Sequence, residues 1–194
     1  MKIYYYNKQC AGNKITEKTG MTGGMIPAYD MDFGACIANE DDMWAGKSGS
    51  PEQICAQNVA SMECKSFADA WTEAMVADSL AQSYNHLWLA ENQAGNACGY
   101  LLANILGDET ELLRIAVNPE CRKDGIGQML MDAYFAYAQT VAVRGLLEVR
   151  HGNNAAKHLY EKNGYHLLAV RKNYYKHPDE DADIYEIVFT ENGE

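Results

Sequence analysis

The sequence predicts an α/β (α+β) protein with a mixed, mostly antiparallel central sheet and helices on both faces. Two observations support this fold class. Segments typical of antiparallel strand pairs flank a single strand–helix–strand unit, and apolar residues recur at helical spacing in the intervening segments. The predicted order is strands, two helices, three strands, helix, strand, helix and two strands, which is the order of a mixed sheet covered by helices.

Two helices are predicted near the start of this order. The letters SPE at residues 50–52 supply a capping serine, a first-turn proline and an acid, so a helix is expected from there to about Ser66. A second helix is expected over roughly Asp69 to Gln82. Its apolar stripe is predicted at Trp71, Met75 and Leu80.

Three strands are predicted next. HLWLAE and ACGYLLANIL are separated by the turn NQAGN, which indicates an antiparallel pair. ELLRIAV predicts the third strand. It is expected to end at Asn118 and Pro119, because proline cannot donate a hydrogen bond to a strand ladder.

The longest helix is predicted after Gly125 and Gly127 and runs to near Val143. GLLEVR then predicts a short strand, and NNAAKHLYEKNG predicts a helix that begins at an asparagine and ends near a left-handed Gly164. YHLLAVRKNYY and ADIYEIVF predict the last two strands, joined by the acidic loop HPDED. The apolar face of the long helix is expected at Ile126, Leu130, Ala133, Tyr134, Tyr137 and Val141.

Composition and charge exclude several classes of protein. The chain has 194 residues, with 16 Lys and Arg against 27 Asp and Glu, which gives a net charge of −11. Because no basic field is available to release counterions, no direct binding of nucleic acid is expected, whereas a basic peptide is a compatible partner. The sequence has no long apolar run, and MKIYYYNKQC lacks the apolar centre of a secretory signal. We therefore expect no membrane span and a cytoplasmic protein.

The six cysteines form no C-x-x-C motif and do not combine with the five histidines at zinc spacing. We therefore expect free thiols in a reducing compartment and no metal site. Cys98 and Cys121 are conceivable nucleophiles for a covalent mechanism. Neither has a patterned histidine partner, so both are interpreted as packing residues.

The first fifty residues differ in character from the rest, because glycines punctuate short stretches such as KIYYY and MIPAYDM. This pattern predicts short strands and turns. We interpret residues 1–50 as an N-terminal extension of unclear role, followed by the main domain over residues 51–194.

The stretch CRKDGIGQML at residues 121–130 carries the strongest single signal for a ligand. Glycines allow close backbone approach, and a helix N-terminus offers unpaired N–H groups with a partial positive charge. Together they favour a phosphate or pyrophosphate. The alternative is a glycine turn with a solvated basic tip. The stretch is not a P-loop, because no lysine follows the second glycine. It is not a dinucleotide-binding fingerprint either, because the first glycine of that motif is missing.

Two later stretches make the pattern more specific: LEVRHGNNAAKHLYEKNGY and RKNYYKHPDEDADIYEIVF. With FADAWTEAM and ELLRIAVNPECRKDGIGQML before them, the chain resembles the GNAT family of N-acetyltransferases over about residues 58–189. Within that family it is most similar to the RimI-type ribosomal-protein-alanine N-acetyltransferases. The N-terminal extension has no counterpart in the resemblance.

The resemblance implies acetyl-CoA as co-substrate. The strand that contains Ile115, Ala116 and Val117 would offer backbone groups to the pantetheine arm of acetyl-CoA. The glycine loop at residues 123–128 would hold the pyrophosphate. Asn153, at the start of the following helix, would also contact the cofactor. The implied cofactor residues are Ile115, Ala116, Val117, Arg122, Lys123, Asp124, Gly125, Ile126, Gly127, Gln128 and Asn153.

The resemblance also implies a general base at Glu148 and a general acid at Tyr160, with direct transfer in a ternary complex. From the residues by themselves, a strand glutamate is more often a solvated edge or a salt bridge, and a helical tyrosine is more often packing. The chemistry suits an α-amine, because its pKa near 8 lets one carboxylate base deprotonate it, whereas that of lysine is about 10.4.

On the acceptor side the resemblance implies Tyr174, Tyr175 and Asp181, which would receive the N-terminal peptide of a basic ribosomal protein that begins with alanine. Two alternatives stay open. One is an enzyme of the same fold that acts on lysine, a polyamine or another small amine. The other is a CoA-binding module without catalysis. The sequence does not indicate an oligomeric state.

Overall fold

The computed structural model describes residues 1–8 and 48–189. Its centre is a seven-stranded sheet in the order β1-β2-β3-β4-β5-β7-β6. All neighbouring strands are antiparallel except β4 and β5, which are parallel, so the predicted mixed and mostly antiparallel sheet is confirmed. The strands are β1 (Lys2–Tyr6), β2 (Asn85–Glu91), β3 (Ala97–Leu106), β4 (Glu109–Val117), β5 (Arg144–Arg150), β6 (His166–Tyr175) and β7 (Glu180–Val188).

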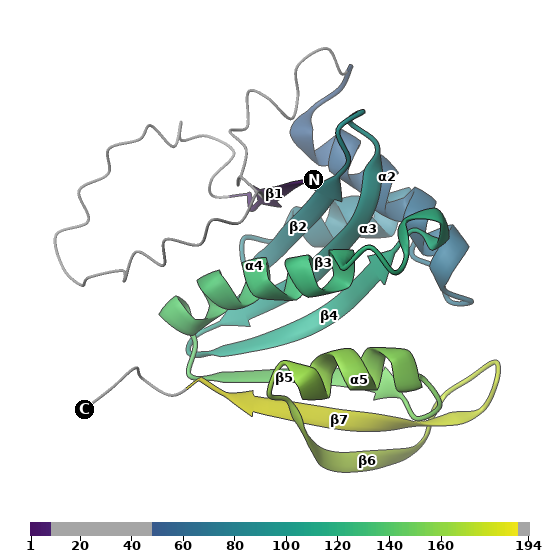
Figure 1. The fold of residues 1–194 in the computed structure, drawn as a ribbon, viewed down its shortest axis with the longest axis vertical. Coiled ribbons are helices and arrows are strands. Elements are labelled where there is room, and N and C mark those ends of the chain that lie inside the picture. Colours follow the sequence, from purple (N-terminus) through teal and green to yellow (C-terminus); the bar gives the residue numbers. More distant parts are fainter. Residues whose placement is uncertain (9–47, 190–194) are drawn as a thin grey trace, which may run out of the picture.

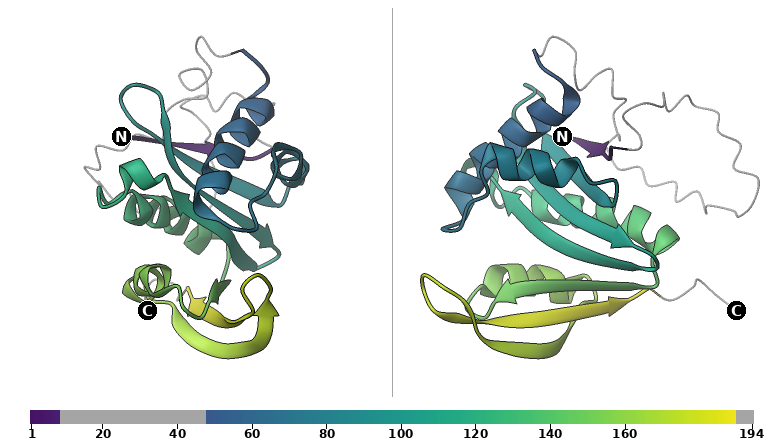
Figure 2. Two further views of the ribbon diagram at one scale, coloured as in Figure 1. Left: turned by 90° about the vertical axis from the view of Figure 1, so that its right-hand side faces the viewer. Right: turned by 180° about the vertical axis from the view of Figure 1, so that it is seen from behind.

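Helices cover both faces of this sheet, as the sequence predicts (Figures 1 and 2). On one face α2 and α3 lie over β1 to β4, and on the other α4 and α5 lie over the sheet. The opposite face of β5, β7 and β6 carries no helix in the described part of the chain. The helices are α2 (Pro51–Ser66), α3 (Glu73–Leu80), α4 (Ile126–Val141) and α5 (Asn154–Lys162), with a short 3-10 helix η1 (Pro119–Cys121).

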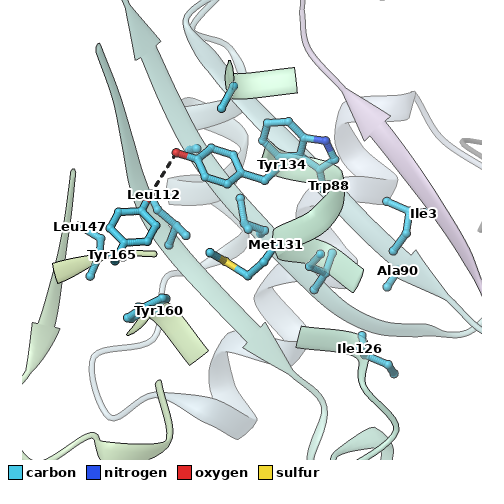
Figure 3. Close-up of a cluster of buried hydrophobic side chains, with 14 of the residues drawn as sticks. Ile3, Trp88, Ala90, Leu112, Ile126, Met131, Tyr134, Leu147, Tyr160 and Tyr165 are labelled. Carbon is cyan, nitrogen blue, oxygen red and sulfur yellow. Dashed lines mark hydrogen bonds between the residues drawn. The ribbon is translucent and has the colours of Figure 1, made fainter. Parts of the chain in front are cut away.

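Each helical layer has its own apolar core. Under α4 and α5 the core includes Trp88, Met131 and Tyr134, and the Tyr134 and Tyr165 hydroxyls lie 3.4 Å apart (Figure 3). A second core fills the space under α2 and α3 and contains Leu87, Leu89, Tyr100 and Leu102 among others. Strands β2 and β3 are therefore buried on both sides, which explains their almost continuous apolar sequence.

The predicted second helix is too long at both ends. The structure begins α3 at Glu73, because Thr72 caps it by accepting a hydrogen bond from the Met75 amide at 3.3 Å. Trp71 therefore precedes the helix, and Met75 is 48% exposed. The buried residues of α3 are Val76 and Leu80, of which the predicted stripe contained only Leu80.

The long helix is largely as predicted but ends slightly earlier. Ile126, Leu130 and Tyr134 are buried, while Val141, at the last position of α4, is 40% exposed. Met131 and Ala138 are buried instead. An α-helix advances 3.6 residues per turn, so the core-facing stripe drifts and reaches Ala138 before the helix runs past the sheet.

The feature that positions the site is the divergence of β4 from β5. Their pairing covers only Glu109 to Leu112 against Arg144 to Leu147, although β4 continues to Val117 and β5 to Arg150. Figure 1 shows the two strands together at one end and apart at the other. The β3–β4 register shifts between Leu102 and Ala103, at the level where the β4–β5 pairing stops. A bulge bends and twists a strand, and it accounts for the separation here.

Strand β1 lies within the N-terminal extension and pairs with β2 at the sheet edge, with Ile3, Tyr4 and Tyr6 buried. The other short strands and turns predicted for the extension fall on residues 9–47, outside the described residues. Among the helices that the structure does describe, none has the length and hydropathy required to cross a membrane.

Candidate active site

The opening between β4 and β5 exposes backbone on the β4 side. From Arg114 to Val117, β4 pairs with β3 on one edge and has no partner on the β5 edge among the described residues. Ile115 and Val117 pack toward the α4 core, whereas Ala116 is buried on the α2 side. The three predicted cofactor residues of this strand therefore sit along a free edge that can pair with the amides of an extended ligand.

The glycine loop joins this strand to α4. Gly125 is the N-cap residue of α4 with a φ of 77°, and no side chain caps the helix. Lys123 also has a positive φ, of 73°. Arg122 donates from Nε to the Val117 carbonyl at 3.1 Å, which ties the loop to the end of β4. The first α4 amides are left for a ligand, and this geometry fits an anionic group such as a pyrophosphate.

Two other predicted cofactor residues, Gln128 and Asn153, make structural contacts here. Gln128 exchanges amide hydrogen bonds with Asn163, at 2.7 and 3.2 Å, and so joins α4 to the end of α5. Asn153 caps α5 by accepting from the Ala156 amide at 3.2 Å. Asp124 is exposed in the loop. Their contacts with a cofactor stay predictions.

Glu148 is the first residue of β5 beyond the last β4–β5 pair. Its side chain is 23% exposed, and Oε1 lies 2.7 Å from Nη1 of Arg171 on β6. The hydrogen bond that Tyr174 donates to Glu148, with partial burial, raises the pKa of Tyr174. Burial of alternate residues along β5 shows that Leu146, Glu148 and Arg150 share the face away from α5.

Tyr160 comes from α5, which covers the face of β5 opposite the Glu148 side chain. It is buried in the α4–α5 core, where its ring meets that of Tyr165 at 6.1 Å between centroids (Figure 3). Burial and then the nearby Tyr175 raise the pKa of Tyr160, so the phenol is protonated at neutral pH. Burial, followed by the charge of Glu148, raises the pKa of Tyr175 to about 12. Tyr175 is thus the electrostatic neighbour of both predicted catalytic residues.

The two acceptor-side tyrosines owe their position to an irregular stretch of β6. Arg171 is opposite Ala182 and Tyr175 is opposite Glu180, so β6 spans four residue steps where β7 spans two. Within this bulge Asn173 has a φ of 52°, and its amide donates to Oδ1 of Asp181 at 2.9 Å. A bulge re-aims side chains, and here Tyr174 reaches Glu148.

Asp181 therefore stabilises the β6–β7 hairpin through contacts with β6. Its Oδ2 lies 2.7 Å from Nζ of Lys172, in addition to the bond from Asn173. Glu148 is directly opposite Ile184, three residues from Asp181, so the two carboxylates lie on opposite faces of the sheet. Direct contact of Asp181 with an acceptor stays a prediction, and its contacts favour support of the bulge that holds Tyr174 and Tyr175.

Comparison with known proteins identifies the family. Residues 56–165 match the family model described as the acetyltransferase (GNAT) family. The chain belongs to the GNAT family. It is therefore an acetyltransferase, and the enzymes of this family use acetyl-CoA. The match spans the opening, the glycine loop and both predicted catalytic residues.

Individual relatives agree with the predicted RimI-type resemblance. The [ribosomal protein bS18]-alanine N-acetyltransferase of Escherichia coli K12 is 32% identical over 126 residues, which cover 63% of this chain and 84% of that one. The N-alpha-acetyltransferase RimI of Mycobacterium tuberculosis is 32% identical over 140 residues, or 69% and 87% of the two chains. The crystal structure of the E. coli ribosomal-protein-S18-alanine N-acetyltransferase superposes with a TM-score of 0.65 at 28% identity, covering 73% and 92%.

Sequence reasoning missed three charged groups around this GNAT site. Arg171 pairs with Glu148, Arg114 pairs with a buried Glu63, and the buried Asp183 contacts Lys157 and His151, each at 2.9 Å. Their partners lie 23 to 51 residues apart in the chain, so no local pattern signals them. A charged residue at a position expected to be buried, such as Asp183 within ADIYEIVF, is the one sequence cue that was available.

A cavity of about 590 Å³ lies away from the predicted catalytic residues. It is bounded by α2, the β2–β3 turn and η1, and neither Glu148 nor Tyr160 lines it. Cys98 and Cys121 do line it, and both are free. Burial, and next the contact with Cys121, raises the pKa of the Cys98 thiol to about 11. A thiol held protonated is a poor nucleophile, which agrees with the interpretation of Cys98 as a packing residue.

Proposed function

We propose that this protein transfers acetyl from acetyl-CoA directly to the N-terminal α-amine of a protein. The proposal rests chiefly on the opening between β4 and β5, which has Glu148 as its first free β5 residue. Tyr160 comes from α5 on the other face of β5, and Tyr175 interacts electrostatically with Tyr160 and with Glu148. A base and a protonated acid therefore flank a free strand edge that suits an extended cofactor.

The residues present fit acetyl-CoA, which supplies the acetyl thioester. The free edge of Ile115 to Val117 would pair with the pantetheine amides. The uncapped start of α4, with Lys123, Gly125 and Gly127, would hold the pyrophosphate. Arg122 fixes the loop against Val117 and adds positive charge.

Two proton movements complete the reaction. The attacking amine forms the new C–N bond and gives up a proton to the Glu148 carboxylate, directly or through one water. The C–S bond breaks, and the Tyr160 phenol donates its proton to the departing thiolate. The raised pKa of Tyr160 keeps that proton available at neutral pH.

The acceptor would approach over the bare face of β5, β7 and β6, where Tyr174 and Tyr175 flank Glu148. We infer an N-terminal peptide of a basic ribosomal protein that begins with alanine. The names of the 32% identical relatives support this class of acceptor, as does the net charge of −11, which favours encounter with a cationic partner.

The test is a competition between two basic peptides of one sequence, one with a free N-terminus and one with that terminus blocked and its lysines intact. Mass spectrometry should place acetyl on the free α-amine only, with CoA released in equal amount. Equal lysine acetylation in the blocked peptide, or turnover with polyamines only, would instead favour a small-amine or lysine acetyltransferase. CoA binding without turnover of any amine would favour a non-catalytic module.

We also infer that residues 1–50 contribute no chemistry, since no predicted site residue lies among them. Strand β1 does add a buried edge to the sheet. A chain that begins at Ser48 should therefore unfold at a lower temperature but bind CoA with the same affinity. Loss of CoA binding in a folded truncation would assign the extension a part in the site.

A further inference from the structure

The turn between α2 and α3, Phe67–Thr72, faces the acceptor side of the opening. It lies next to the β6–β7 hairpin in opposite views of the fold (Figures 1 and 2). The carboxylate of Asp69 in this turn adds a small contribution to the raised pKa of Tyr175, after burial, Glu148 and Tyr174. The turn therefore lies beside the hairpin that carries Tyr174 and Tyr175.

This turn is anchored by a fully buried carboxylate. Glu63, in the last turns of α2, is 0% exposed. Its Oε2 accepts a hydrogen bond from the Trp71 amide and another from Nη1 of Arg114, both at 2.8 Å. Its Oε1 accepts a hydrogen bond from the Tyr100 hydroxyl. One carboxylate thus joins the turn to β3 and β4.

Arg114 completes the anchor from the β4 side. Its guanidinium lies between two rings of the turn, 4.9 Å from the centre of Phe67 and 4.8 Å from that of Trp71. Its Nη2 donates to the Asp69 carbonyl at 3.2 Å. Arg114 belongs to the part of β4 that has separated from β5 and directly precedes Ile115 of the predicted cofactor edge.

A buried ion pair contributes little net stability to a fold, because the desolvation of both charges offsets their attraction. It does fix the relative positions of the groups that it contacts, because a planar guanidinium with fixed donors holds its partners in one arrangement. The hydrogen bonds of Glu63 and Arg114 fix the turn to β3 and β4. Their arrangement sets where the turn stands relative to Tyr174 and Tyr175.

We propose that Glu63 and Arg114 are positioning residues for the acceptor. They hold the α2–α3 turn at the distance from the β6–β7 hairpin that the acceptor peptide requires, and they leave the cofactor loop untouched. This proposal rests on the proposed function for the identity of the acceptor, but its structural part, the anchoring of the turn, is testable independently.

The experiment compares Arg114→Met and Arg114→Lys with the wild-type protein. Arg114→Met removes the fork and the charge and should raise the acceptor KM about tenfold, with little change in kcat. Arg114→Lys restores one charged contact and should recover part of that loss. The Kd of CoA should stay unchanged in both. The matched control is Arg144→Met, which removes another ion-paired arginine, 3.2 Å from Glu109 at the far end of β4 and β5, and should leave all three constants unchanged.

A second readout does not depend on activity. Hydrogen–deuterium exchange of residues 67–72 should rise in Arg114→Met and in Glu63→Gln, because the Trp71 amide loses a fixed acceptor, while exchange in α4 stays unchanged. If Glu63→Gln does not fold, Phe67→Leu replaces it, since that change loosens the turn and leaves the ion pair intact. An unchanged acceptor KM in folded variants with faster exchange would overturn the proposal, as would unchanged exchange in the turn.

The two proposals fail in different ways. If the wild-type protein prefers an amine other than an α-amine, the proposed function fails, and the KM comparison is made with the preferred amine. A rise in KM for that amine would still support the positioning role.

Discussion

Nη1 of Arg171 lies 2.7 Å from Oε1 of Glu148, and this contact joins the edge strand β6 to the first free residue of β5. The Arg171 side chain is 50% exposed, so water can solvate it when an acceptor takes its place. The carboxylate that we propose as the base is therefore paired with an arginine that can move away. When Arg171 moves, its charge is solvated and is not left buried without a partner.

Glu148→Gln should fold normally and lose activity. The amide keeps the size of the side chain but cannot accept the proton of the amine, so kcat should fall by about 10²- to 10⁴-fold. Steady-state kinetics at saturating substrates measures this fall, and calorimetry should give the wild-type affinity for CoA. Glu109→Gln, at an exposed ion pair on β4, is the control. A wild-type kcat in Glu148→Gln would refute the assignment of the base.

Tyr160→Phe should reduce kcat and keep the core intact, because only the hydroxyl is lost from a packed ring. Burial raises the pKa of Tyr160 above its usual value of about 10, so the phenol stays protonated at lower pH and loses its proton only above that value. The wild-type rate should therefore show no decline caused by Tyr160 below about pH 10. A basic limb near pH 8 that disappears in Tyr160→Phe would contradict this.

Gly125→Ala should weaken CoA binding, because φ at this position is 77° and a side chain strains the loop that we propose holds the pyrophosphate. Gly107→Ala is the matched control, since Gly107 has a φ of 64° in the β3–β4 turn and open space around it. Each change should cost about 1–2 kcal/mol of stability. Calorimetry with CoA should give a higher Kd for Gly125→Ala than for Gly107→Ala. Equal Kd values in the two variants would show that the loop is not part of the cofactor site. Gly127→Val should also weaken binding.

Asp181→Asn should raise the acceptor KM without changing the affinity for CoA. The change weakens the bond to the Asn173 amide and the pairing with Lys172, so the β6 bulge that presents Tyr174 and Tyr175 is less well fixed. Asp179→Asn in the same hairpin removes only an exposed pairing with Lys176 and serves as the control. Identical kinetics in the two variants would show that the bulge needs no support from Asp181.

Asp183→Asn should lower stability at neutral pH, and the difference from wild type should shrink in acid. Burial opposes ionisation of this carboxyl, but hydrogen bonds from His151 and Lys157 outweigh it and lower the pKa of Asp183. A lowered pKa contributes stability that is present above the unfolded value near 3.9 and is lost as the pH falls through the folded value. Thermal melts from pH 7 to pH 3 measure this, and a constant difference across that range would contradict it.

Much of this protein follows from local sequence. Ser50 and Pro51 start α2 where the capping pattern places it, and the glycine at 125 adopts the positive φ that a loop entering a helix requires. These features depend on interactions between residues a few positions apart, and such interactions do not require tertiary contacts. The resemblance supplied Glu148 and Tyr160 because their motifs are continuous segments.

The tertiary structure decided what depends on distant partners. Trp71 lies outside α3, ahead of the Thr72 cap, and its amide donates to the distant Glu63. The roles of Arg171 and Asp181 follow from a β6 bulge that no local pattern marks. The opening itself depends on a register shift between β3 and β4, which is a property of two strands together. Long-range pairing and burial are set only when the chain is folded, because they are energies of contact between segments and not preferences of any one segment.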